Sequence, residues 1–286
     1  MEKFVRQNLI YETVVGSTAY GLNTPESDID IKGVTIPPKE YYFGMRTFEQ
    51  QECGKDHVIY SLRKFVKLAR DCNPNIIEML YTDDKHILFI NEAGKKLREN
   101  RQLFLSKKAK FTFSGYAFAQ LKRIKGHRKW LMFDQKEPIE EDYFCTKTRG
   151  SGHGKVIKYQ HFREGEYKEA LKKWNHYLVW KKNRNPARAE LEEKYGYDCK
   201  HAMHLVRLLR MGHEILTIGK VNVLREDREE LLDIRAGKWE YDKLVSYAEE
   251  LEKELDVLYD KSILPHSPND KAINSLLIEI TEESLK

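Results

Sequence analysis

Two short motifs near the N-terminus carry groups that can bind phosphates, and Gly16-Ser17 is the first of them. It follows residues 9–15, an apolar run rich in β-branched side chains that predicts a strand. A glycine at the end of a strand allows a tight turn and a close approach of the backbone to a ligand. Backbone N–H groups at such a turn, together with the Ser17 hydroxyl, would bind an anion such as a phosphate.

Asp28 and Asp30 form the second motif, with ten residues between Ser17 and Asp28. Residues two apart on an extended segment point to one face, so both carboxylates would lie together while Ile29 and Ile31 point into the core. Adjacent carboxylates repel each other unless a cation lies between them, and Mg²⁺ prefers oxygen ligands. Each motif alone is commonly structural, but the two in this order favour metal-assisted phosphoryl or nucleotidyl transfer.

The residues around both motifs resemble the signature of the DNA polymerase beta-like nucleotidyltransferase superfamily, in particular its RNA-repair-associated branch in bacteria and phages. The matching string is Gly16-Ser17-Thr18-Ala19-Tyr20-Gly21 with Asn23-Thr24-Pro25-Glu26-Ser27-Asp28-Ile29-Asp30. Further similar blocks are Asn73-Pro74-Asn75 with Glu78, and Lys200-His201-Ala202 with Arg207-Leu208-Leu209. The resemblance implies an α+β fold, in which a small mixed β-sheet nucleotidyltransferase core with flanking helices is followed by a mainly helical domain.

The resemblance also implies the ligands of the site. Gly16 and Ser17 would hold the triphosphate of an NTP such as ATP, and Asp28 and Asp30 would bind two Mg²⁺ ions, which Mn²⁺ could replace. Two such metals stabilise both the attacking and the leaving oxygen of an in-line displacement.

Members of the superfamily use a third carboxylate on a neighbouring strand, close to the acceptor. Asp56 is the predicted counterpart and metal ligand, because it would open a strand over residues 56–60 after the turn residues Gly54-Lys55. Glu52, across the same hairpin, is the alternative. Asp56 could also be only a turn residue after Gly54-Lys55, with no catalytic role.

A predicted helix over residues 199–218 places Lys200, His204 and Arg207 on one face, opposite an apolar stripe. With the resemblance, Lys200, His201 and Arg207 are predicted to bind the nucleotide, whereas an ordinary solvated face is favoured for His204. Glu78 lies among apolar residues and is expected to pack or cap a helix.

Charge and strand patterns divide the chain. Residues 1–106 hold the strand signals and 15 basic against 15 acidic side chains, which indicates the catalytic core. Residues 107–286 are predicted to form a mainly helical domain. Its segment 107–188 has 21 basic against 8 acidic side chains, net +13, and 14 of the 32 aromatics, whereas 189–286 has 14 against 22, net −8. A basic, aromatic-rich segment suits RNA, although solvated helix faces over buried aromatics would give the same pattern.

Composition excludes other classes. The 286 residues are 41% hydrophobic and 33% charged, as in globular proteins, with no apolar run that could span a membrane. The four cysteines lie far apart, so a zinc or disulfide framework is not expected and a cytoplasmic location is predicted. Residues 150–155 resemble a P-loop, but Arg149 stands at the required glycine and Val156 at the Ser/Thr position.

The predicted function is transfer of an NMP from an NTP to an acceptor hydroxyl with release of pyrophosphate, the favoured acceptor being an RNA 3′ end. Nucleotidylation of a protein hydroxyl, as in toxin-silencing relatives, and a non-catalytic RNA-binding module are the alternatives. The residues leave open the base, the acceptor, any template and the oligomeric state.

Overall fold

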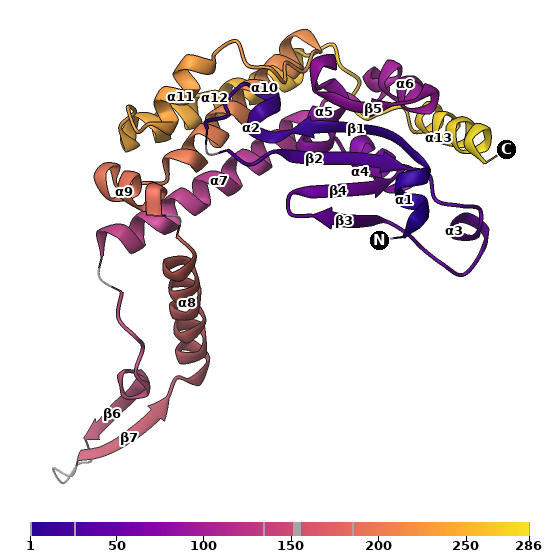
Figure 1. The fold of residues 1–286 in the computed structure, drawn as a ribbon. Coiled ribbons are helices and arrows are strands. Elements are labelled where there is room, and N and C mark those ends of the chain that lie inside the picture. The colour runs from indigo at the N-terminus through magenta and orange to yellow at the C-terminus, as the bar shows by residue number, and fades with distance from the viewer. Residues whose placement is uncertain (1, 26, 134, 151–155, 185, 286) are drawn as a thin grey trace. The chain divides into compact units, whose positions relative to one another are not determined.

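The computed structural model describes residues 2–25, 27–133, 135–150, 156–184 and 186–285. It divides the chain into two compact units (Figure 1). The first unit joins residues 1–122 to residues 200–286, and the second holds residues 123–199. The sequence-based division at residue 106 differs from this, because residues 107–122 and 200–286 belong to the same unit as the N-terminal sheet.

A five-stranded mixed sheet forms the centre of the first unit, in the order β3-β4-β2-β1-β5. β1 pairs antiparallel with β2 and β5, β2 runs parallel to β4, and β3 and β4 form an antiparallel hairpin. The strand over residues 9–15 and the hairpin around Gly54-Lys55 are thus confirmed, whereas the short edge strand β5 is not among the predicted elements. The strands span Leu9–Val15 (β1), Asp30–Thr35 (β2), Gln50–Gly54 (β3), His57–Ser61 (β4) and Ile87–Ile90 (β5).

Local capping explains where several helices of this unit begin. The Ser61 side chain accepts a hydrogen bond from the Lys64 N–H at the start of α4. The predicted cap at Asn73 is confirmed, with Pro74 in the first helical position of α5. Helices packed near the sheet are α1 (Lys3–Gln7), α2 (Gly16–Ala19), α3 (Glu40–Phe43), α4 (Leu62–Arg70), α5 (Pro74–Tyr81), α6 (Glu92–Glu99) and α13 (Asp270–Ser284).

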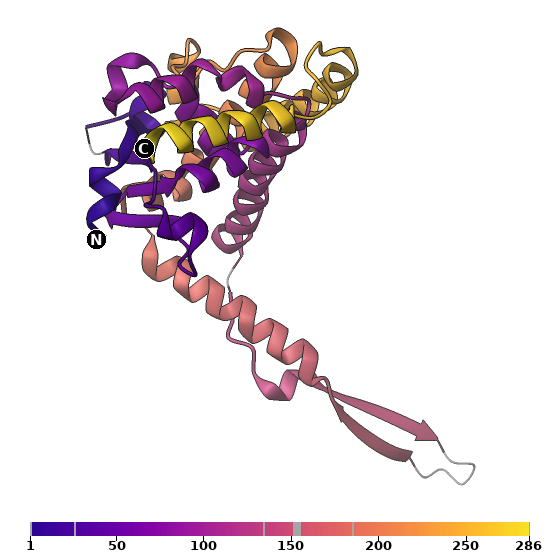
Figure 2. The same ribbon diagram turned by 90° about the vertical axis from the view of Figure 1, so that its right-hand side faces the viewer.

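The C-terminal helices complete the core of the first unit. α10 (Cys199–Ile218) buries its predicted apolar stripe, including Leu205 and Leu209, and α12 (Tyr241–Lys261) buries Leu244 and Leu255. α13 packs against α4 and α6, on the helices that cover the sheet (Figure 2). α7 (Lys108–Met132) begins in this unit, and α11 (Arg228–Arg235) lies between α10 and α12 in the chain. None of the helices in the described ranges is both long and apolar enough to cross a membrane.

The second unit contains an antiparallel hairpin that the sequence pattern does not predict. β6 (Phe144–Gly150) pairs along its length with β7 (Val156–Phe162), and α8 (Glu164–Asn183) and α9 (Pro186–Tyr195) follow. The prediction of a mainly helical region is confirmed, and this hairpin is an addition to it, because backbone pairing in a two-stranded ribbon needs no alternation of apolar side chains. The glycine-rich loop predicted over residues 150–155 lies outside the described residues from residue 151 onward.

Gly94 tests the packing of α6 against β1. A Cβ at this position would lie 2.2 Å from the backbone oxygen of Ile10 in β1, so Gly94→Ala should lower the free energy of unfolding by about 1–3 kcal/mol. Gly115→Ala is the matched control, because Gly115 is exposed on α7 and nothing lies within 4 Å of a Cβ built there, and a gain of about 0.5–1 kcal/mol is expected. Denaturant unfolding measures both, and equal effects would contradict the close packing at Gly94.

Candidate active site

The turn after β1 brings the two predicted motifs into contact. Gly16 has a φ of +69°, a left-handed conformation that favours glycine. A Cβ at Gly16 would lie 2.3 Å from Oδ2 of Asp30, so a larger residue would collide with that carboxylate. The turn continues as α2, where the N–H of Leu22 donates to the carbonyl oxygen of Ser17 at 2.8 Å. Glycine is therefore required here both by the backbone conformation and by the nearby aspartate.

The sheet places Asp56 beside Asp30. β2 begins at Asp30, and the Ile31 N–H donates to the carbonyl oxygen of Asp56 at 2.8 Å where β2 and β4 run in parallel. Burial raises the pKa of the Asp30 carboxyl, and the negative charges of Asp56 and then Asp28 raise it further. The cations Lys32 and Lys200 act in the opposite direction. The three predicted aspartates therefore lie close enough to repel one another.

Lys55 lies next to two of these carboxylates. Its Nζ is 3.3 Å from Oδ2 of Asp28 and 3.8 Å from Oδ2 of Asp56. The hydrogen bond and charge of Asp28, followed by the charge of Asp56, raise the pKa of Lys55. The Lys55 side chain is 81% exposed, so this partial neutralisation is readily exchanged for another cation.

Asp56 occupies a turn and not the first position of a strand. β4 begins one residue later than predicted, at His57, and Asp56 has a φ of 60°. Aspartate is one of the few residues found in this left-handed region. The alternative, Glu52, lies within β3 opposite Val58, and β4 separates β3 from β2 and Asp30. The geometry therefore favours Asp56 over Glu52 as the third carboxylate.

Arg207 is buried, which corrects its predicted place on an accessible basic face. Its side chain is 5% exposed, and its Nη1 atom lies 2.5 Å from Oε1 of Glu78. The guanidinium also stacks over the Tyr20 ring at 3.8 Å, and the Tyr20 hydroxyl donates to the second oxygen of Glu78. Arg207 therefore holds the turn that follows Ser17 and does not present its charge to a nucleotide. Glu78 packs in the core, as expected.

The other basic residues of α10 differ from Arg207. Lys200 lies near enough to Asp30 for its charge to lower the pKa of that carboxyl. This position agrees with the prediction that Lys200 binds the nucleotide. His201 is partly exposed beside it in the first turn of α10. His204 is not a simple solvated residue, because burial, followed by the charges of Arg207 and Lys200, lowers its pKa well below the usual range.

The sequence patterns miss one residue of the site, Lys32, and misplace another, Ile29. Lys32 lies on the same face of β2 as Asp30, and burial lowers its pKa while Glu78 and Asp30 raise it. Its position two residues after Asp30 was the available signal. Ile29 is 62% exposed, so its predicted place in the core is wrong. Strand alternation does not apply to Asp28 and Ile29, because they precede β2.

The chemistry of the three aspartates suits Mg²⁺, which takes carboxylate oxygens and several waters. Within the ranges that the structure describes, no three His, Cys, Asp or Glu side chains are already arranged around one point as metal ligands. The aspartates converge, but they do not form a closed coordination set.

Residues 1–279 match the model of the RNA repair pathway DNA polymerase beta family (RlaP), and the chain belongs to that family. An uncharacterized 38.9 kDa protein of Enterobacteria phage T4 is 25% identical over 298 residues, covering 85% of this chain and 87% of that protein. The uncharacterized protein YcgL of Bacillus subtilis is 30% identical over 83 residues, covering 26% and 31%. No solved structure matches the chain.

Repulsion among the carboxylates predicts a gain in stability for Asp30→Asn in the presence of a chelator. The raised pKa of Asp30 means that the folded state binds its proton more tightly than the unfolded chain, so stability falls as pH rises through this range. The variant should therefore exceed the wild type in free energy of unfolding at neutral pH, and the gain should vanish below the ordinary pKa of 3.8.

Asp28→Asn is the matched control, because the Asp28 side chain is 67% exposed and should change stability less. Denaturant unfolding at several pH values measures both variants. A loss of stability in Asp30→Asn at neutral pH would contradict the arrangement described here.

Proposed function

We propose that this protein transfers an NMP from an NTP to an acceptor hydroxyl and releases pyrophosphate. The observation that carries the proposal is the contact of Gly16 with Asp30, beside Asp56 on the neighbouring strand. A turn that can bind phosphate and carboxylates that can bind a divalent cation thereby meet at one end of the sheet. Membership of the RNA repair pathway polymerase beta family supports the same class of reaction.

The roles of the residues follow from their positions. Gly16 and the Ser17 hydroxyl hold the phosphates that leave, while Asp28 and Asp30 hold Mg²⁺. When bound, Mg²⁺ supplies Lewis-acid stabilisation of the charge that develops on the phosphate oxygens. Asp56 accepts the proton of the acceptor hydroxyl while the oxygen of that hydroxyl bonds to the α-phosphorus of the NTP. The bond from that phosphorus to the bridging oxygen breaks, and pyrophosphate leaves.

We place the RNA acceptor on the second unit, where an aromatic cluster lies among basic residues. The cluster consists of Trp130, Trp174, Tyr177 and Trp180, and Trp174 and Tyr177 have ring centroids 5.3 Å apart. All four rings are partly exposed. The Lys181 ammonium lies 5.8 Å from the Tyr177 ring. Half-exposed rings beside cations can stack bases, while the cations neutralise the phosphates of a single strand.

A cytoplasmic location remains a prediction from the cysteine spacing.

Nucleotide transfer tests the proposal directly. The wild-type protein, incubated with each labelled NTP, Mg²⁺ and either total RNA or cell lysate, should label RNA. Asp28→Asn, Asp30→Asn and Asp56→Asn should each abolish the labelling, because each removes a carboxylate from the site. Glu52→Gln is the matched control on the neighbouring strand and should retain activity.

The outcomes separate the alternatives. Full activity of Asp56→Asn with loss in Glu52→Gln would exchange the roles of these two carboxylates. Labelling of proteins in lysate, without labelling of RNA, would favour the protein-modifying function. No transfer with any NTP, together with RNA binding, would favour a non-catalytic module.

RNA affinity across a salt series tests the second unit. Trp174→Ala should weaken binding of a single-stranded RNA by about 1–3 kcal/mol without changing the salt slope, because it removes only stacking. Lys181→Gln should flatten the slope of log K against log[salt] by about 0.7, the value for one phosphate contact. Leu178→Ala, 42% exposed on the same helix, is the control for Trp174. Affinity that does not depend on salt would contradict an RNA acceptor at this unit.

A further inference from the structure

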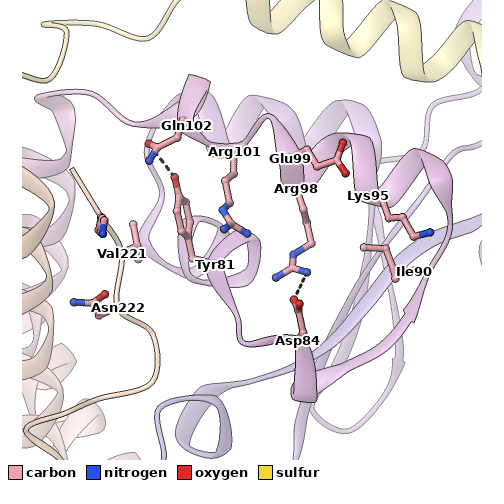
Figure 3. A pocket seen from close by; sticks show the side chains of 11 residues that line it. Tyr81, Asp84, Ile90, Lys95, Arg98, Glu99, Arg101, Gln102, Val221 and Asn222 are labelled. Carbon is pink, nitrogen blue, oxygen red and sulfur yellow. Dashed lines mark hydrogen bonds and ion pairs between the residues drawn. The ribbon is translucent and has the colours of Figure 1, made fainter. Parts of the chain in front are cut away.

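A cavity lies in the first unit, and none of its lining residues belongs to the carboxylate site. It opens between the end of α5, α6, the 3₁₀ turn of Arg101–Phe104 and residues 220–222 (Figure 3). Its volume is about 580 Å³, within the range of roughly 300–1,000 Å³ that is typical of small-molecule sites.

Arg101 is a cation in the wall of the cavity whose charge is available to a ligand. Its guanidinium stacks over the Tyr81 ring at 4.9 Å, and the Tyr81 hydroxyl donates to Oε1 of Gln102 at 3.3 Å. Among the described residues, no carboxylate or carbonyl oxygen accepts a hydrogen bond from Arg101. Stacking fixes the plane of the guanidinium and leaves its N–H groups free for a bidentate acceptor such as a phosphate. Figure 3 shows it directed into the cavity beside Tyr81.

The neighbouring charges are already matched with partners. Arg98 binds Asp84 at 2.8 Å and donates to the carbonyl oxygen of Thr82 at 2.6 Å. Lys95 binds Glu92, on its own helix, at 2.6 Å. The carboxylate of Glu99 points away from the guanidinium groups of Arg98 and Arg101 (Figure 3).

Lys220 adds a second available cation. It is exposed on the segment that forms the opposite wall of the cavity, next to Val221 and Asn222. No ion pair to Lys220 is present within the described ranges. The same segment leads to Arg225, whose backbone N–H donates to the carbonyl oxygen of Tyr20 at 3.1 Å.

We infer that this cavity binds the phosphate group of a nucleotide. Arg101 and Lys220 hold the phosphate, the Asn222 amide donates to it, and the remaining volume accommodates the ribose and base. A free mononucleotide and the 5′-phosphorylated end of an RNA present the same group. The inference concerns binding only and does not depend on nucleotide transfer at the aspartates.

Binding to the full-length protein in the presence of a chelator tests this inference. The probes are AMP, inorganic phosphate and a short oligoribonucleotide with either a 5′-phosphate or a 5′-hydroxyl. Arg101→Gln and Lys220→Gln should each weaken binding of the best phosphorylated probe about tenfold, as expected for loss of a charge-assisted contact. Lys95→Gln removes an equal charge from the rim of the cavity but from a paired lysine, so it should change affinity less than about twofold.

The probes also distinguish the two sources of the phosphate. Equal affinities for AMP and the 5′-phosphorylated oligonucleotide would indicate a mononucleotide site. Preference for the oligonucleotide, lost when its 5′-phosphate is absent, would indicate an RNA end. Lys220→Gln alters no contact within the described fold, so its result does not depend on the stability of Arg101→Gln. Unchanged binding in Arg101→Gln and Lys220→Gln, or binding removed by Asp30→Asn instead, would overturn the inference.

Discussion

The buried ion pair between Glu78 and Arg207 is the interaction on which the organisation of the first unit depends. It joins α5 to α10 across a sequence separation of 129 residues, and Tyr20 completes it from the turn after α2. Loss of one partner of such a pair leaves an uncompensated buried charge, at a cost of about 3–5 kcal/mol. The pair therefore holds the C-terminal helices against the sheet and keeps the turn after Ser17 in position.

The candidate active site, unlike this neutralised ion pair, brings carboxylates of like charge together. Asp28, Asp30 and Asp56 lie together in partial exposure, and the lysines around them reduce but do not remove the repulsion. Burial of Lys32 beside Asp30 adds a cation that solvent reaches poorly. A bound cation would relieve the repulsion among these carboxylates, so the proposed binding of a divalent ion and the raised pKa of Asp30 have the same cause.

The two units contribute different recognition chemistry. The first offers carboxylates at the end of the sheet and a cavity in which Arg101 and Lys220 supply the available positive charge. The second offers partly exposed rings on α8, with basic side chains near them. Charged groups give orientation and salt dependence, whereas stacking tolerates any base. Contacts of both kinds suit a substrate that is a phosphate polymer and carries bases.

Local signals in the sequence determined most of the elements and the two motifs. The strand at 9–15, the cap at Asn73 and the apolar stripe of α10 depend on neighbours in the chain, so their patterns are readable. Only the tertiary structure decided that Asp56 adjoins Asp30 and that Arg207 is buried with Glu78. It also decided that residues 200–286 belong to the N-terminal unit. These facts depend on strand register and on contacts between distant segments. The sequence alone does not distinguish a charged residue that faces solvent from one that is paired with a buried carboxylate.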